Sequence, residues 1–525
     1  MKKEAHRNNG KKGNSASEAM RKRKQQKRER EKGLIEYLDQ FGIASMIEVA
    51  KTLKRKFVVH CGPTNSGKTY QALQALKNAG NGVYLGPLRL LALEVYDELN
   101  SGGYPCTLLT GEELLITKGA TYVASTIEMC NYERRAKVAV IDECQLITDA
   151  ARGGHWTKAI LTLDAEEIHI CTAPEALPLI QNLIKSTGAE CNIIHHERLT
   201  PLVFSGTVET INKVQPGDAL ITFSRKGVLS IAASLERAGI KASVIYGALP
   251  PASRKEEVSR FTRGETTVVV ATDAIGMGIS LPIRRVIFCE TTKYDGTGSR
   301  RLNAGEIKQI AGRAGRYGKY DVGEVLTMST PSLIESAMKS SAPLINEITI
   351  PFPEAALESQ YSIPELCAAW GKMPEISGIK RVDMSDAEKL YARLPLMPDG
   401  ISKKELYSYV CCPVDTKSDA LVSYWSECCS AIAEGRDFPE PPFSEDNLES
   451  CELKYKALDI KHQMLRRIGV EEDGLAEKDR LCGKINKFLR GSKARFLKRC
   501  SCCGKLLPAN YAYGMCEECF DMMRW

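Results

Sequence analysis

Short apolar runs alternate with longer amphipathic stretches along the first part of the chain. The runs of strand length are residues 56–61, 82–86, 121–124, 137–141 and 167–171, and the segments between them repeat apolar residues at helical spacing. Alternating strands and helices are typical of a parallel, doubly wound sheet, because two parallel strands need a long crossover connection. The pattern predicts one α/β domain over residues 34–198, in which a helix leads into the first strand.

The same alternation begins again after residue 198. Strand-length runs at residues 218–223, 242–246, 267–271, 285–288 and 323–328 predict a second α/β domain over residues 199–345. From residue 346 the strand pattern fades, and helical stretches interrupted by prolines continue to residue 495. The predicted fold class is therefore α/β, with two tandem doubly wound parallel-sheet domains followed by an α-helical C-terminal domain over residues 346–495.

The formal net charge of +7 is concentrated at the start of the chain. Residues 1–33 hold 13 Lys and Arg against four Glu, which leaves a balance of −2 for all later residues. A block of like charges repels itself, so we expect residues 1–33 to form a disordered basic tail, either an arm for nucleic acid or a solvated segment. The sequence has no run of about 18 apolar residues and no secretory signal, so no membrane span is expected.

The clearest chemical motif follows the first predicted strand. The segment Gly-Pro-Thr-Asn-Ser-Gly-Lys-Thr fits the phosphate loop G-x-x-x-x-G-K-[ST], in which glycines let backbone N–H groups face a phosphate chain. The Lys68 ammonium is predicted to reach the β- and γ-phosphates of ATP, and the Thr69 hydroxyl to hold Mg²⁺. The plainer alternative is a glycine turn before a helix. The predicted nucleotide-binding residues of this loop are Gly62, Pro63, Thr64, Asn65, Ser66, Gly67, Lys68 and Thr69.

Two further segments carry groups suited to phosphoryl transfer. Asp142 and Glu143 end the apolar strand at 137–141, where Asp142 is predicted to meet Mg²⁺ and Glu143 to orient and deprotonate the attacking water. Near the end of the second domain, Arg313 and Arg316 lie three residues apart, on what is expected to be one helical face. Planar guanidinium groups suit phosphate oxygens and the charge that develops on a γ-phosphoryl group, so both are predicted arginine fingers.

Taken together, four segments resemble motifs I, II, V and VI of superfamily 2 helicases. They are Gly62–Thr69, Asp142–Gln145, Thr272–Gly278 and Gln309–Arg316. The phosphate loop, Val244–Gly247 and Ala274–Gly278 also closely resemble the RNA helicase of the mitochondrial degradosome and its bacterial relatives. The resemblance covers residues 55–345 strongly and 345–430 weakly, and the chain departs from the family at Cys144, where an aliphatic residue is usual.

The resemblance implies two RecA-like domains that sandwich ATP and advance along RNA, from 3′ to 5′ if the family's polarity holds. It assigns catalysis to Lys68, Asp142, Glu143, Gln309, Arg313 and Arg316, with Asp273 and Gly278 also at the nucleotide. It assigns contacts with the nucleic-acid backbone to Arg89, Thr110, Thr126, Arg225 and Thr272. It also implies a ribonuclease partner. We expect a cytoplasmic protein, as for the bacterial relatives, with the mitochondrial matrix as the alternative.

The last cysteines form a separate pattern. Cys500 and Cys503 make one C-x2-C pair, and Cys516 and Cys519 make a second after twelve residues. Two such pairs supply four thiolates for a tetrahedral structural zinc site, so residues 496–525 are predicted to form a small zinc-binding module. Cys502 could replace Cys500 as a ligand. The plainer alternative is a set of free thiols.

Three other functions are the alternatives to an RNA helicase. A DNA helicase would use the same backbone-contacting motifs, which do not report the sugar. A noncatalytic RNA-binding or scaffold protein would have degenerate motifs, whereas Lys68, Asp142 and Glu143 are intact. A phosphate-loop kinase would not need the second α/β domain that carries the Gln309–Arg316 segment. The sequence does not reveal the oligomeric state.

Overall fold

The computed structural model describes residues 5–276, 281–296, 298–470, 474–491, 493, 496–507, 511 and 513–522, and the side chains of the first helix from residue 21 onward, without residue 23. Its first domain is built on an eight-stranded sheet of order β4-β3-β5-β2-β6-β7-β1-β8, in which β4 pairs antiparallel and the other pairs are parallel. The strands are β1 (Lys56–Cys61), β2 (Gly82–Gly86), β3 (Cys106–Leu109), β4 (Leu114–Leu115), β5 (Tyr122–Thr126), β6 (Ala136–Ile141), β7 (Ala165–Thr172) and β8 (Glu190–His195).

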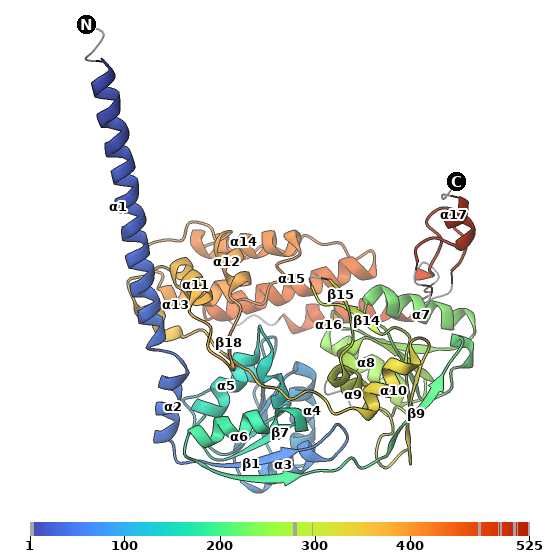
Figure 1. Ribbon diagram of the computed structural model, residues 1–525. Helices are drawn as coiled ribbons and strands as arrows, with labels where there is room; N and C mark the ends of the chain where they lie inside the picture. The colour runs from blue at the N-terminus through green and yellow to red at the C-terminus, as the bar shows by residue number, and fades with distance from the viewer. Residues whose placement is uncertain are drawn as a thin grey trace.

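Helices cover both faces of this sheet, as a doubly wound fold requires (Figure 1). Side chains of α3 (Lys68–Asn78) and α4 (Arg89–Ser101) share one apolar cluster with one face of the sheet. Side chains of α5 (Gly153–Thr162) and α6 (Leu177–Ser186) share a second cluster with the other face. The five predicted strands are confirmed, whereas β3, β4 and β8 were missed. Strand β8 lies at the sheet edge and is mostly exposed, so it has no apolar run that marks it in the sequence.

The second domain has a six-stranded parallel sheet of order β11-β12-β10-β13-β16-β9. Its strands are β9 (Leu202–Thr207), β10 (Asp218–Ile221), β11 (Ala242–Ile245), β12 (Val268–Ala271), β13 (Arg285–Phe288) and β16 (Gly323–Thr327). One face packs against α8 (Pro251–Thr262), α9 (Ala304–Ala311) and α10 (Pro331–Lys339), and the other against α7 (Arg225–Arg237). A short antiparallel pair, β14 (Thr292–Tyr294) and β15 (Ser299–Arg301), precedes α9. The prediction of a second parallel α/β domain is confirmed.

The C-terminal region packs against both sheet domains. The parallel pair β17 (Ile348–Ile350) and β18 (Ile379–Arg381), together with α11 (Ile363–Lys372), belongs to the core cluster of the first domain. The backbone at β17 approaches α5 so closely that a Cβ on Gly154 would lie 2.7 Å from the nitrogen of Pro351. The helical prediction for residues 346–495 therefore missed two short strands that complete the neighbouring domain.

The remaining helices cross above the two domains (Figure 1). They are α12 (Ser385–Tyr391), α13 (Lys403–Val410), α14 (Asp419–Glu434), α15 (Leu448–Arg467) and α16 (Leu475–Arg490). Apolar residues on one side of α15, with those of α16, pack onto the face of the second domain that carries α7. Apolar residues on its other side join the cluster of α12, α13 and α14. Helix α15 is thus buried between the helical region and the second domain.

The basic segment at the start of the chain forms a helix. Helix α1 (Ala5–Asp39) runs away from the body of the molecule, and α2 (Ile43–Thr52) follows it (Figure 1). This differs from the disordered tail expected over residues 1–33. Lys, Arg, Gln, Glu and Ala dominate its sequence. These residues are strong helix formers, so they favour a helix despite the repulsion between like charges. Within the described residues, the helices are too short or too polar to cross a membrane.

Candidate active site

The phosphate loop joins the end of β1 to the first turn of α3, as predicted. Asn65 and Gly67 have positive φ angles of 63° and 78°, which curl the loop before the helix begins. The Lys68 ammonium is buried and donates a hydrogen bond to the carbonyl of Pro63 at 3.2 Å. It therefore lies over the loop, where it can neutralise a phosphate held by the loop N–H groups.

Asp142 directly follows β6, beside the phosphate loop. The Thr69 hydroxyl donates to its carboxylate at 3.2 Å, and the Tyr84 hydroxyl donates to it at 3.0 Å. Burial and the neighbouring Glu143 raise the pKa of Asp142 to about 6, against the lowering effect of Lys68. A buried carboxylate next to a hydroxyl supplies the hard oxygen ligands that Mg²⁺ prefers, and the ion's charge would offset the cost of burying the carboxylate. Sequence reasoning missed Tyr84, which sits in the interior of an apolar strand.

Glu143 is held in an unusual backbone conformation. Its φ angle is 51°, in the left-handed region that non-glycine residues seldom adopt. The side-chain amide of Gln145 donates to the Glu143 carboxylate, and the amide oxygen of Gln145 accepts from the N–H of Ala173 at 3.3 Å. The strained backbone and the Gln145 contact together fix the direction of the Glu143 carboxylate beside Asp142.

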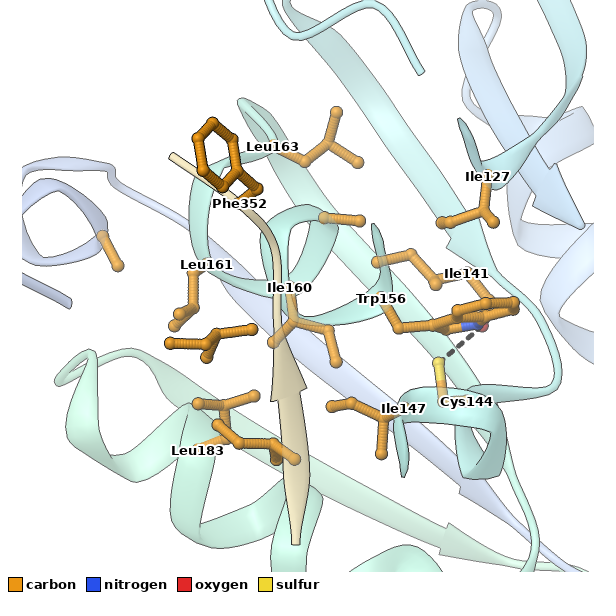
Figure 2. Packing of buried hydrophobic residues seen from close by; sticks show 14 of the residues in the cluster. Ile127, Ile141, Cys144, Ile147, Trp156, Ile160, Leu161, Leu163, Leu183 and Phe352 are labelled. Carbon is orange, nitrogen blue, oxygen red and sulfur yellow. Dashed lines mark hydrogen bonds between the residues drawn. The ribbon is translucent and has the colours of Figure 1, made fainter. Parts of the chain in front are cut away.

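Cys144 behaves as a small apolar residue. It is fully buried in the core cluster of the first domain, and its thiol contacts the carbonyl of Ile141 at 3.3 Å. Figure 2 shows it beside Trp156 and Ile147, and the Trp156 indole donates to the carbonyl of Asp142 at 3.0 Å. The departure from the usual aliphatic residue therefore preserves a packing role under the acidic pair.

The second domain brings Arg313 to the same site. The Arg313 guanidinium donates to the carbonyl of Gly276 at 3.1 Å, and burial lowers its pKa while Glu143 and Asp142 raise it. Gln309 lies on α9, close to Gly276, and Arg316 is exposed. Asp273 pairs with Lys293 at 3.4 Å, whereas Gly278 lies outside the described residues. Arg313 is therefore near enough to the acidic pair to act on the same nucleotide.

Arg198, in the linker between the domains, was missed by sequence reasoning. Its guanidinium donates to the carbonyls of Thr64 and Gly312, each at 2.8 Å. A second bond crosses the interface directly, from the side-chain amide of Asn65 to the carbonyl of Gly315 at 2.8 Å. The phosphate loop and the arginine segment are thus joined across the domain interface. A lone arginine in a connecting segment carries no motif that would have identified it.

A row of three histidines supports the strand before the phosphate loop. His60 contacts His196 at 3.1 Å and His169 at 2.9 Å, and His169 contacts Glu167 at 2.6 Å. Burial, together with the two neighbouring histidines, lowers the pKa of His60 to about 4. The His196 ring packs against that of His60, with the ring centroids 5.3 Å apart.

Three of the five residues predicted to contact nucleic acid meet one helix. Arg225 pairs with Glu452 at 2.8 Å, and Arg89 pairs with Glu112 and, at 3.7 Å, with Asp459. The carbonyl of Thr110 accepts from Arg466 at 3.2 Å. Glu452, Asp459 and Arg466 all belong to α15. The other two predicted contacts, Thr126 and Thr272, are largely buried at the carboxyl ends of β5 and β12.

The four terminal cysteines come together as the spacing predicts. One sulfur from each of Cys500, Cys503, Cys516 and Cys519 lies within 4.8 Å of the others. The N–H of Cys516 donates to the Cys500 sulfur at 3.3 Å, and N–H groups of Cys503 and Cys516 lower the pKa of Cys500 to about 6. Cys502 is exposed and lies outside this group. The group is compatible with zinc.

Comparison with known proteins agrees with this arrangement. Residues 44–196 match the model for the DEXQ-box helicase domain of Suv3, and residues 202–318 match the helicase conserved C-terminal domain. A mitochondrial DExH-box ATP-dependent RNA helicase of Arabidopsis thaliana, DExH16, is 36% identical over 86% of this chain and 85% of its own length. The mitochondrial ATP-dependent RNA helicase SUV3 of rice is 39% identical, over 70% of this chain and 66% of its own length. Human mitochondrial SUPV3L1 is 42% identical over 54% of this chain, which spans 38% of that protein. Because both RecA-like domains match helicase family models and these relatives are ATP-dependent RNA helicases, the chain belongs to the Suv3 family of ATP-dependent RNA helicases.

Proposed function

We propose that this protein hydrolyses ATP between its two RecA-like domains and uses the resulting domain movement to travel along and unwind RNA, from 3′ to 5′. The observation that carries the proposal is the bonding of the phosphate loop to the Gly312–Arg316 segment across the domain interface, directly through Asn65 and indirectly through Arg198. A nucleotide bound there would contact both domains, so its hydrolysis would change how they bind each other.

Each residue of the site has a distinct part in hydrolysis. Lys68 and the loop N–H groups hold the β- and γ-phosphates, and Thr69 and Asp142 would hold Mg²⁺, which neutralises phosphate charge when bound. Glu143 takes a proton from the attacking water, and Gln309 assists from the second domain. Arg313 and Arg316 stabilise the charge that builds up on the γ-phosphoryl group in the transition state.

The decisive experiment measures ATP turnover with single-stranded RNA, single-stranded DNA and no nucleic acid, followed by unwinding of duplexes with a 3′ or a 5′ overhang. RNA stimulation and a requirement for a 3′ overhang support the proposal. Stimulation by DNA alone would indicate the alternative of a DNA helicase. Stimulated turnover without unwinding would indicate an ATPase that remodels ribonucleoprotein.

The relatives named above are mitochondrial, and none of them supports the expected bacterial cytoplasmic location. We therefore propose a mitochondrial location, the alternative that the resemblance offered. A ribonuclease partner remains part of the proposal. Purification of the tagged protein from isolated mitochondria, with and without RNase treatment, tests both points, because a direct partner stays bound after RNA is destroyed.

The terminal module is proposed to bind one structural zinc ion. A tetrahedral site with Zn–S bonds of about 2.3 Å separates its sulfurs by about 3.8 Å. The Cys503 and Cys516 sulfurs lie 3.7 Å apart, which fits this geometry. Four protein ligands leave no open position for water, so the ion would stabilise the module without catalysis, and the module would serve contact with RNA or a partner.

Metal analysis of the purified protein tests the zinc proposal. The expected result is about one zinc per chain, lost in Cys519→Ser but retained in Cys502→Ser, which removes an exposed thiol outside the group. Absence of zinc from the wild-type protein, or equal loss from both variants, contradicts the four-cysteine assignment.

A further inference from the structure

Helix α15 presents one row of polar residues to both RecA-like domains. Glu452, Tyr455, Asp459 and Arg466 follow one another at intervals of three, four and seven residues, which places them along one face. Glu452 contacts the second domain through Arg225, and the other three contact the first domain. The row therefore spans the two domains at the residues predicted to hold the RNA backbone.

Each of the two acidic residues in this row also has a second partner. Glu452 accepts a hydrogen bond from the hydroxyl of Tyr246, whose side chain is almost fully buried. Asp459 pairs with Lys478 of α16, which is 5% exposed. Neither Tyr246 nor Lys478 belongs to the predicted RNA contacts. Each carboxylate therefore contacts a buried group in addition to its arginine.

The arginines are more accessible than the carboxylates that hold them. The Arg225 and Arg89 side chains are 29% and 30% exposed, against 7% for Glu452 and 14% for Asp459. A guanidinium has five N–H donors, so a carboxylate that engages one edge leaves the other donors for a phosphate. Both arginines are thus partly exposed while they pair with a carboxylate of α15, and Arg89 pairs with Glu112 as well.

We propose that Glu452 and Asp459 are positioning residues for RNA. Through them, α15 fixes one phosphate-binding arginine from each RecA-like domain, Arg225 and Arg89, at a separation set by a rigid helix. Seven helical residues span about 10.5 Å, so both arginines address neighbouring parts of one strand. This inference rests on the proposed function, in which the two arginines contact the RNA backbone.

The opposite interpretation treats the carboxylates as phosphate mimics that RNA must displace. Displacing Glu452 would remove the carboxylate that accepts from the buried Tyr246 hydroxyl, and displacing Asp459 would remove the carboxylate paired with the buried Lys478 ammonium. Buried groups that lose their partners are costly, and more so when charged. The second partners therefore favour carboxylates that stay in place when RNA binds.

The test measures binding of a labelled single-stranded RNA to Glu452→Gln and Asp459→Asn in the full-length protein. Each variant should raise the Kd for RNA, and the RNA concentration that gives half-maximal ATP turnover, about ten-fold, because its arginine loses an ion-pair partner. Turnover at saturating RNA should change less than about two-fold, since the ATP site is untouched. The control Glu449→Gln removes an equal charge from the exposed first turn of the same helix and should leave the Kd for RNA near that of wild type.

A second comparison separates positioning from a general loss of structure. In an Arg225→Gln background, Glu452→Gln should weaken RNA binding no further, because the carboxylate acts through that arginine.

Tighter RNA binding by the single variants would support phosphate mimicry and would overturn the inference. An unchanged Kd for RNA in the single variants would overturn it as well. If the wild-type protein binds no RNA, the proposed function itself fails. If Arg225→Gln weakens binding but Glu452→Gln does not, only this inference fails.

Discussion

Two arginines make the same kind of bond on two sides of the molecule. On the ATP side, Arg198 donates to the carbonyls of Thr64 in the first domain and Gly312 in the second, each at 2.8 Å. On the α15 side, Arg466 donates to the carbonyls of Thr110 and Gly111 at 3.2 and 3.4 Å. Arg198 therefore joins the two RecA-like domains directly, whereas these bonds of Arg466 join the first domain to α15.

The difference shows how the two sides can respond to separate ligands. The ATP side is closed by contacts between the domains themselves, and these can change with each nucleotide state. On the other side the domains are bridged by a helix, so the predicted RNA contacts keep a fixed support. Variants on the first side should change turnover, and variants on the second should change RNA affinity.

The largest expected effect is that of Lys68→Ala. Loss of the buried ammonium removes the charge that binds and stabilises the β- and γ-phosphates, and turnover should fall at least about a thousand-fold. Steady-state ATPase assays with saturating RNA measure it, and Lys185→Ala, an exposed lysine of α6, serves as the control. Near-normal turnover in Lys68→Ala would overturn the assignment of the site.

Arg313→Ala and Arg316→Ala should lower turnover by about a hundred-fold or more while changing ATP affinity far less, because the arginines act chiefly in the transition state. Turnover and the Kd for a nonhydrolysable ATP analogue are measured in parallel. The control is Arg237→Ala, an exposed residue at the end of α7. Equal losses in both quantities would make the arginines ground-state ligands and would weaken the contrast between the two sides.

Arg198→Ala tests whether direct contact between the domains matters for hydrolysis. Loss of its charged hydrogen bonds to both domains should reduce turnover about ten-fold, with little change in RNA affinity. A single preparation assayed for ATPase and for RNA binding gives both values. A variant that loses RNA affinity and keeps its turnover would reverse the assignment of the ATP side.

Arg466→Ala is the matched variant on the α15 side. The loop at Thr110 and Gly111 loses two hydrogen bonds that are longer than those of Arg198, so the RNA concentration for half-maximal turnover should rise only about three-fold. Maximal turnover should remain close to that of wild type. If Arg466→Ala and Arg198→Ala change turnover and RNA affinity in the same way, the proposed difference between the two sides is wrong.

Cys144→Ala should have the smallest effect on activity. Removing a buried sulfur from a packed core costs about 1 kcal/mol of unfolding free energy, which denaturant titration can measure. Turnover should stay within about two-fold of wild type, because the side chain packs into the core and does not contact the predicted nucleotide site. A large loss of turnover without a loss of stability would show that the thiol has a role beyond packing.

Sequence reasoning succeeded where one short segment carries the whole signal. The phosphate loop, the acidic pair after β6 and the cysteine pairs each depend on spacing within a few residues, and the structure brings the members of each group together. It failed at edge strands such as β8, whose residues are too exposed to form an apolar run. It also missed β17, because three residues are too few for a periodic pattern.

The amino-acid sequence by itself determined the two α/β domains, the family and the chemical groups of the ATP site, because alternating apolar segments and closely spaced motifs are local properties. Only the tertiary structure decided which distant residues meet. Arg198 joins Thr64 to Gly312, Glu452 reaches Arg225, and the segment around β17 completes the core of the first domain. These contacts link residues more than a hundred positions apart, and their energy depends on burial and partners that a single arginine or glutamate in the sequence does not reveal.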